Sequence, residues 1–222
     1  MKERTPLTQS TQAVTRETRT QDLLAETSAG QKRRIMWIDG VGGFMLVEKD
    51  EVMIGQAASG NVSVDIGIVG DLSRQAAAIK RVDGDYLLQP LQPTWLNDYP
   101  VDRAQLLADD SLIQLGQRVK LRFSRSSPLS ATARLDLESL HRFKPNVDGI
   151  LLLSDSCILG PNVGSHVLCP SWSNELLLFR HGSGWFFRSM VEVNVDGEPM
   201  QGQIPLVAGM RMDGEDFSLS IE

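Results

Sequence analysis

Three histidines and two cysteines are of the residue types that ligate zinc: His141, His166, His181, Cys157 and Cys169. Structural zinc sites use ligands in closely spaced pairs, and none of these five residues has a partner at such a spacing. Two thiols in a chain that shows no export signal are more typical of reduced core cysteines than of a disulfide. We therefore expect no metal site and no cofactor.

Two further groupings suggest catalysis or nucleotide binding. Ser165, His166 and Asp148 supply a hydroxyl, an imidazole and a carboxylate, but no glycine-flanked nucleophile turn surrounds the serine. The glycine-rich run 40–43 resembles part of a nucleotide-binding loop, but the motif's third glycine is missing and the chain continues as a strand. Because motif spacing assembles no nucleophile, base and orienting group, the sequence predicts a protein that is not an enzyme.

Short apolar or alternating runs, separated by turn residues, begin at Ile35. Pairs such as Asp83-Gly84 and Asn97-Asp98 favour hairpins, because Gly, Asn and Asp accept positive φ at low cost. The pattern predicts an all-β fold of the sandwich type. The runs that we predict as strands are Ile35–Ile38, Gly43–Val47, Val52–Ile54, Ala76–Val82, Tyr86–Gln89, Leu112–Leu115 and Val119–Phe123.

Charge is distributed unevenly along the chain, whose net charge is −6. Residues 1–34 carry seven Lys and Arg against four Asp and Glu, whereas residues 146–222 carry three against ten. An acidic body offers no broad cationic surface to a nucleic-acid backbone. No apolar run approaches the roughly 20 residues of a membrane-spanning helix, and no apolar signal segment is visible. We expect a cytoplasmic protein that binds neither nucleic acid nor a membrane.

Composition divides the chain into four parts. Residues 1–34 are rich in Thr, Gln and Ser and predict a disordered arm. Residues 35–128 form the first β unit, residues 129–145 a linker, and residues 146–222 a second β unit. The linker has an incomplete strand pattern, although the spacing of Ala133, Leu135 and Leu137 could form one exposed strand.

The second unit repeats the first at an offset of 99 residues. When Asn97 is placed over Asp196, the aromatic strand start at Tyr86 coincides with Trp185, and the turn 82–85 coincides with 181–184. The match of turn, aromatic residue and strand continues without gaps for about fifty residues. Two copies of one β unit are therefore expected.

Four motifs of the first unit stand in the order typical of forkhead-associated (FHA) domains. Met53-Ile54-Gly55-Gln56 resembles the strand and Gly-Arg pair that opens the family pattern, and Ser73-Arg74-Gln75-Ala76 resembles its Ser-x-x-His element. Thr94-Trp95-Leu96-Asn97-Asp98 resembles its Thr-x-x-Asn-Gly loop, and residues 107–116 resemble its closing segment. The resemblance covers roughly residues 35–128 and implies a sandwich of about eleven strands whose loops at one end bind phosphothreonine.

The resemblance implies a phosphopeptide site at Gln56, Ser73, Arg74 and Asn97. A phosphate needs a hydroxyl donor and a cationic fork, which Ser73 and Arg74 supply, while the Asn97 amide would bond the peptide backbone. Gln56 stands where the family has arginine and so loses a charge-assisted bond, and Ala76 stands where it has a bracing histidine.

The second unit departs further from the family pattern. Gly160-Pro161 stands at the Gly-Arg pair, and Asp196 places a carboxylate where the amide is expected. An anionic ligand would be repelled there. We therefore expect a non-enzymatic module of two tandem FHA-like sandwiches that binds a protein or phosphopeptide partner through the first one. The alternative is a structural or assembly protein whose two units have both lost phosphopeptide binding.

Overall fold

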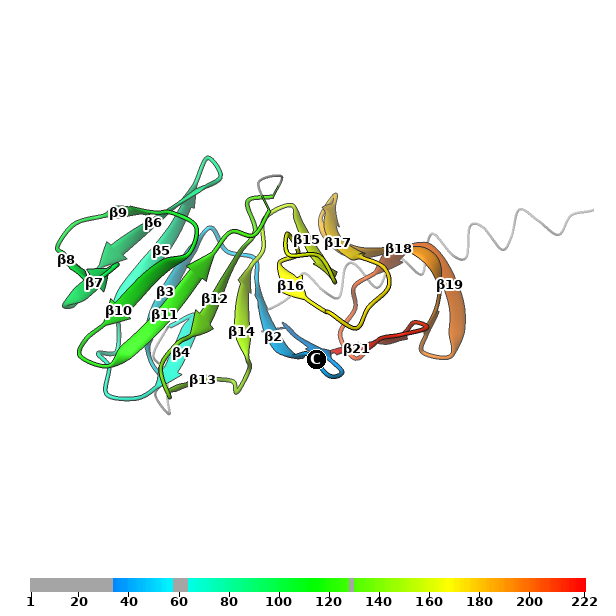
Figure 1. The fold of residues 1–222 in the computed structure, drawn as a ribbon, viewed down its shortest axis with the longest axis horizontal. Helices are drawn as coiled ribbons and strands as arrows, with labels where there is room; N and C mark the ends of the chain where they lie inside the picture. Colours follow the sequence, from blue (N-terminus) through cyan, green and yellow to red (C-terminus); the bar gives the residue numbers. More distant parts are fainter. Residues whose placement is uncertain (1–33, 58–63, 128–129) are drawn as a thin grey trace, which may run out of the picture.

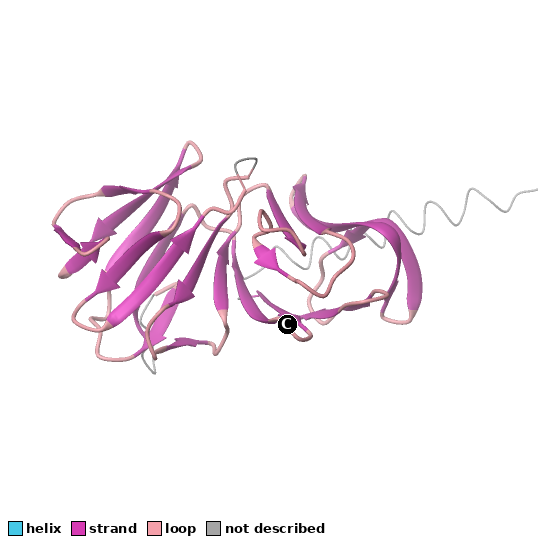
Figure 2. Cartoon of the chain, viewed as in Figure 1, coloured by secondary structure: helices cyan, strands magenta, loops and turns pink. Residues whose placement is uncertain are grey.

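A computed structural model describes residues 34–57, 64–127 and 130–222. All regular elements in these residues are β-strands, which confirms the predicted all-β class (Figure 2). The predicted arm lies outside the described residues except for Arg34, which begins the first strand. None of the described residues belongs to a helix that could span a membrane.

A six-stranded sheet forms one layer of the first sandwich, in the order β13-β4-β3-β5-β6-β9. The other layer is the end of a longer sheet, in the order β14-β12-β11-β10-β7-β8 (Figure 1). The strands of the first layer are β3 (Glu51–Gln56), β4 (Ile66–Val69), β5 (Ala77–Val82), β6 (Asp85–Pro90), β9 (Gln105–Leu107) and β13 (Arg142–Lys144). Those of the second layer are β7 (Thr94–Leu96), β8 (Tyr99–Val101), β10 (Ser111–Leu115), β11 (Val119–Ser124), β12 (Ala133–Leu137) and β14 (Gly149–Leu152).

The long sheet continues in the order β2-β1-β21-β20-β18-β17-β15-β16, and this part wraps around a core of its own; we call it the second sandwich. The twelve-residue β18 curves around this half and shifts register between Ser189 and Val193 (Figure 1). The strands of this half are β1 (Arg34–Ile38), β2 (Gly42–Val47), β15 (Ser156–Gly160), β16 (Val167–Leu168), β17 (Leu176–His181), β18 (Gly184–Val195), β19 (Glu198–Pro205), β20 (Arg211–Asp213) and β21 (Ser218–Ile221).

The two halves exchange strands. β1, which comes first in the chain, pairs with β21 of the second half, whereas β12 pairs with β11 of the first half. Between them, β2 and β14 pair with each other in parallel. Each sandwich is therefore completed by a strand from the other half of the chain.

Residues 129–145, which we expected to form a linker, contribute β12 to one layer of the first sandwich and β13 to the other. The reason is burial: Ala133 and Leu135 are completely buried, as is Phe143 except for 2% of its surface. Alternating apolar residues in a short segment are enough to pin it to a sheet.

Two hydrophobic cores are present, and β2 and β14 separate them. Met45 and Ile150 point into the first core, which also contains Tyr86 and Phe123. Their neighbours along the two strands point the opposite way, into the second core. β2 and β14 thus form a wall that is buried on both faces.

Candidate functional site

Gln56, at the end of β3, braces the loop that follows β4. Its backbone N–H donates to the carbonyl of Ser73 (2.9 Å), and its side-chain Nε2 donates to the carbonyl of Gly70 (3.3 Å). The side chain is half-buried and already hydrogen-bonded. Gln56 therefore orders the loop 70–73, the part of the candidate site that carries Ser73.

Ser73 and Arg74 lie where a ligand can reach them. A Cβ on Gly55 would collide with the carbonyl oxygen of Arg74, so the loop rests directly on the backbone of β3. Both side chains are exposed, and among the described residues neither has a side-chain hydrogen bond or ion pair. One hydroxyl donor and one guanidinium are thus held on a fixed backbone with their polar groups free.

Ala76 connects this loop to the segment after β6. Its N–H donates to the carbonyl of Ile54 (2.8 Å), and its own carbonyl accepts from Leu91 (3.0 Å) and Gln92 (3.1 Å). The exposed Gln92 therefore lies beside the Ser73 loop. It is the amide-bearing residue that sequence reasoning missed, because the Thr-x-x-Asn-Gly pattern directed attention to Asn97.

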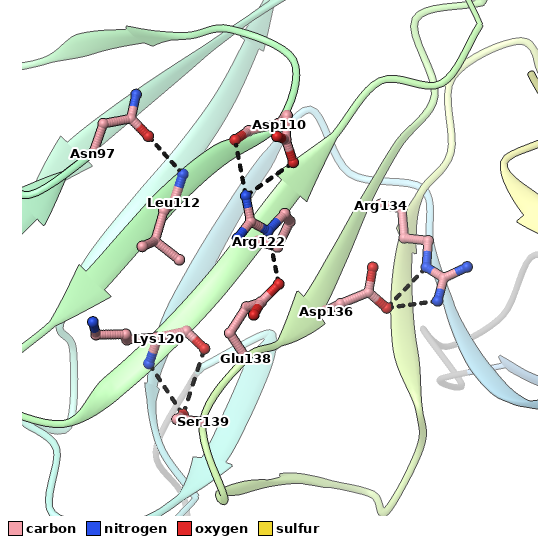
Figure 3. A network of polar contacts seen from close by, with 9 residues as sticks. All are labelled: Asn97, Asp110, Leu112, Lys120, Arg122, Arg134, Asp136, Glu138 and Ser139. Carbon is pink, nitrogen blue, oxygen red and sulfur yellow. Dashed lines mark hydrogen bonds and ion pairs between the residues drawn. The ribbon is translucent and has the colours of Figure 1, made fainter. Parts of the chain in front are cut away.

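Asn97 closes the hairpin between β7 and β8 with φ of 51°. Its N–H donates to the carbonyl of Leu112 (2.8 Å). Its Oδ1 accepts from the N–H of Leu112 (2.8 Å) (Figure 3). Its hydrogen bonds thus run to β10 and not to the Ser73 loop, and only Nδ2 remains for a ligand. Thr94 begins β7 nearer that loop, since its hydroxyl donates to the carbonyl of Gln92 (2.8 Å).

Asp196 makes the same pair of bonds in the second half. Its φ is also 51°, its N–H donates to the carbonyl of Arg211 (3.0 Å), and its Oδ1 accepts from the N–H of Arg211 (2.8 Å). Arg211 follows Leu112 by the same 99 residues that separate Asp196 from Asn97. A side-chain oxygen is what this turn requires, and an amide and a carboxylate both provide it.

Most arginines near the outer face of β10–β12 are neutralised by acids. Arg122 contacts Asp110 (2.9 Å) and Glu138 (2.7 Å), and Arg134 contacts Asp136 (2.7 Å) (Figure 3). Such pairs leave little positive charge for a ligand. Arg74 differs from these arginines because it has no acidic partner among the described residues.

The corresponding loops of the second sandwich are tied together by acids. Glu175 accepts from Asn162 (2.7 Å), and a carboxylate oxygen of Asp216 accepts from the N–H of Ser173. A Cβ on Gly160 would lie 2.8 Å from Cγ of Glu175. Where the first sandwich presents a free arginine, the second presents carboxylates that already bridge its loops.

His166 and Asp148, considered above for catalysis, are each hydrogen-bonded to a backbone N–H group. Nδ1 of the buried His166 accepts from the N–H of Ile158 (2.9 Å), so it cannot donate to a carboxylate, while Asp148 accepts from the N–H of Gly43 (2.7 Å). Burial raises the pKa of Cys157 to about 12 and that of Cys169 to about 11, so both remain thiols. Within the described residues, no three His, Cys, Asp or Glu side chains are grouped to hold a metal ion.

The chain resembles a solved structure but matches no protein-family model. No protein-family model matches the chain, and no curated protein matches it. Among solved structures, the chain is similar to the FHA structure of Rv0020c at 23% sequence identity and a TM-score of 0.26, over 40% of this chain and 89% of that chain.

Proposed function

We propose that the chain is a non-enzymatic protein-interaction module whose first sandwich binds a phosphorylated peptide. Ser73 and Arg74 contact the phosphate, Gln56 holds their loop, and Asn97 holds the neighbouring hairpin and offers its Nδ2. The observation that carries the proposal is the freedom of Ser73 and Arg74 on a loop whose backbone is fixed by hydrogen bonds. A hydroxyl and a guanidinium are the donors that phosphate prefers. The two free, buried thiols agree with a cytoplasmic setting.

The test uses the full chain and a degenerate pool of phosphothreonine peptides, with the unphosphorylated pool for comparison. We expect the wild type to prefer the phosphorylated pool and Arg74→Ala to weaken that binding about tenfold, the effect of losing one charge-assisted hydrogen bond. Ser73→Ala should weaken it less. Arg180→Ala, which removes an exposed arginine from the second sandwich, should leave it unchanged.

The second candidate is an assembly protein, and the second sandwich favours it. Its corresponding loops are closed by the bonds to Glu175 and Asp216, and the stacked rings of Trp172 and Phe217 (4.5 Å between centroids) lie in the same region. If the two peptide pools bind the full chain equally, the phosphopeptide function is wrong and the assembly reading replaces it.

A further inference from the structure

A short basic strand lies beside the candidate site. β13 pairs antiparallel with β4, which places it at the edge of the six-stranded sheet (Figure 1). Phe143, at its centre, is buried in the first core, so Arg142 and Lys144 point to the opposite, exposed face. β13 lies after β11 in the chain, outside the first unit of residues 35–128 that the sequence predicts.

The register aligns Lys144 with the backbone that supports Arg74. Lys144 lies opposite Gly67 on β4, and Gly67 lies opposite Gly55 on β3, where the carbonyl of Arg74 rests. Neighbouring strands are about 4.8 Å apart, so Lys144 lies about 10 Å from Gly55 across the sheet. The other two residues of this row, Gly67 and Gly55, have no side chains. The nearest atoms above Gly67 belong to Ala57, which adds only a methyl group. Both glycines are buried, Gly67 under Ala57 and Gly55 under the carbonyl of Arg74, so Lys144 and Arg74 lie on the two sides of this short covered row.

Arg142 and His141 join the strand to the braced loop. Arg142 lies opposite Val69, one residue before the Gly70 whose carbonyl accepts from Gln56. The imidazole of His141 packs on Gly70 so closely that a Cβ there would be 2.5 Å from its Cδ2. The loop that bears Ser73 is thus held from one side by Gln56 and from the other by the segment that leads into β13.

The three cations are free of acids. Arg74, Arg142 and Lys144 are exposed, and in the part of the chain that the structure describes none has an ion pair. Asp65, on the same side of β3, is already bonded to Lys49 (2.6 Å) and to the N–H of Met53 (2.8 Å). Asp71 is the other acid of this loop, and one carboxylate does not balance three cations.

We propose that β13 completes the phosphopeptide site: Arg142 and Lys144 supply the positive charge that Gln56 does not, and the phosphate binds between them and Arg74. The inference rests on the proposed function and adds to it a composite site, in which residues from both sides of the predicted boundary bind one phosphorylated peptide. The uncharged Gln56 then has a consistent role, because it orders the loop while β13 provides the charge.

The experiment compares two double variants of the full chain by fluorescence anisotropy. Arg142→Ala with Lys144→Ala should weaken binding of the phosphothreonine peptide pool about five- to tenfold at low salt, because each exposed ion pair contributes modestly. The unphosphorylated pool should bind as before, and the salt dependence of phosphopeptide binding should decrease. Arg180→Ala with Arg188→Ala removes the same charge from the second sandwich and should change neither. Arg142→Lys with Lys144→Arg should retain wild-type binding.

Three results would overturn the inference, and they differ in what else they imply. If the wild type prefers the phosphorylated pool and the β13 variant binds it equally well, β13 is no part of the site while the proposed function stands. If both double variants weaken binding equally, net charge alone is responsible. If the wild type shows no preference for phosphate, the proposed function and this inference fail together. Matching thermal unfolding curves for all variants confirm that the fold is intact.

Discussion

Gly55 is the residue on which the geometry of the candidate site depends most directly. The carbonyl of Arg74 occupies the space that any side chain at this position would need, and it belongs to the backbone, so it cannot rotate away. We expect Gly55→Ala to push the Ser73–Arg74 loop off β3, to lower the free energy of unfolding by about 1–3 kcal/mol, and to abolish phosphopeptide binding. Urea denaturation and anisotropy measure the two effects.

Gly164→Ala is the matched control for this substitution. A Cβ there would meet its nearest neighbour, the carbonyl of Ser126, at an ordinary 3.9 Å. It should leave stability and binding near those of the wild type. If Gly55→Ala behaved like Gly164→Ala, the loop would be free to move, and the fixed backbone invoked for Ser73 and Arg74 would not exist.

His166 makes stability depend on pH. Burial lowers its pKa from an ordinary 6.5 to about 4. Between these values the unfolded chain binds a proton that the folded chain does not, so the free energy of unfolding falls as pH falls from 6.5 toward 4. We expect a loss of about 2 kcal/mol from this residue between pH 7.5 and pH 5.

Denaturation curves at these two pH values measure the loss, and His166→Asn is the comparison. Asparagine keeps an acceptor for the N–H of Ile158 but does not titrate, so its stability should change less between the two pH values. Equal pH dependence in both proteins would show that the pKa of His166 is the same in the folded and the unfolded chain.

The family resemblance indicated part of the candidate site. Ser73 and Arg74 were predicted from their place in a family pattern, and the structure shows them exposed on one loop. Gln92 was not predicted, since its position beside Ala76 depends on a hydrogen bond between segments sixteen residues apart. The charge on β13 was also missed, because only strand pairing brings Arg142 next to β4.

At the level of elements, the hairpin between β7 and β8 tests whether Asn97 is a ligand or a turn residue. Asn97→Asp keeps the oxygen that accepts from Leu112, as Asp196 does for Arg211, and should change the free energy of unfolding little. Asn97→Ala loses that bond and leaves a residue with no polar side chain in the left-handed conformation, at φ of 51°. This should lower the free energy of unfolding by about 2–3 kcal/mol. Chemical denaturation of both variants measures this difference.

Peptide binding separates the two roles of Asn97. If its amide contacts the peptide, Asn97→Asp should reduce phosphopeptide binding even though the fold is intact, because the free Nδ2 is lost and a negative charge is gained. If it serves only the turn, the aspartate variant should bind nearly as well as the wild type. An aspartate variant as unstable as the alanine variant would contradict the structural role shared with Asp196.

Seven strands of the first unit were predictable from the sequence, but their partners were not. Each of the seven predicted runs corresponds to a strand, because alternation and turn residues are local signals. β4, β7, β8 and β9 were missed, since strands of three or four residues carry too little alternation. Alternation of apolar and polar residues shows which side chains of a strand share a face, but not which strand lies beside it. The pairing of β1 with β21 therefore could not be predicted. The uninterrupted apolar runs of β2 and β14, buried on both faces, are the local signal of the shared wall.

For the whole molecule, strand exchange predicts that removing β1 opens the second core. Met36 and Ile38 are almost fully buried there, and each contributes about 1.5–3 kcal/mol through burial. We expect a chain that begins at Asp39 to expose Cys157 and Cys169 to a thiol reagent, although both cysteines lie more than a hundred residues from the truncation. Absorbance of the released thiolate measures their reaction rate.

A chain that begins at Arg34 is the control, because it lacks only residues outside the described part and keeps β1 whole. Its two thiols should react as slowly as those of the full chain, in keeping with their complete burial. Equal protection in the chain that begins at Asp39 would mean that the second half folds without its borrowed strand, and that the pairing of β1 with β21 is dispensable.

The wall formed by β2 and β14 also has a consequence for how the chain can evolve. A gene that doubles one β unit normally leaves two modules that can be lost, shuffled or fused elsewhere one at a time. Here a break anywhere between residues 125 and 132 would take β12 and β14 from the first core and β1 and β2 from the second. Neither product would inherit a complete sandwich, so deleting either half would not leave the other as a folded unit.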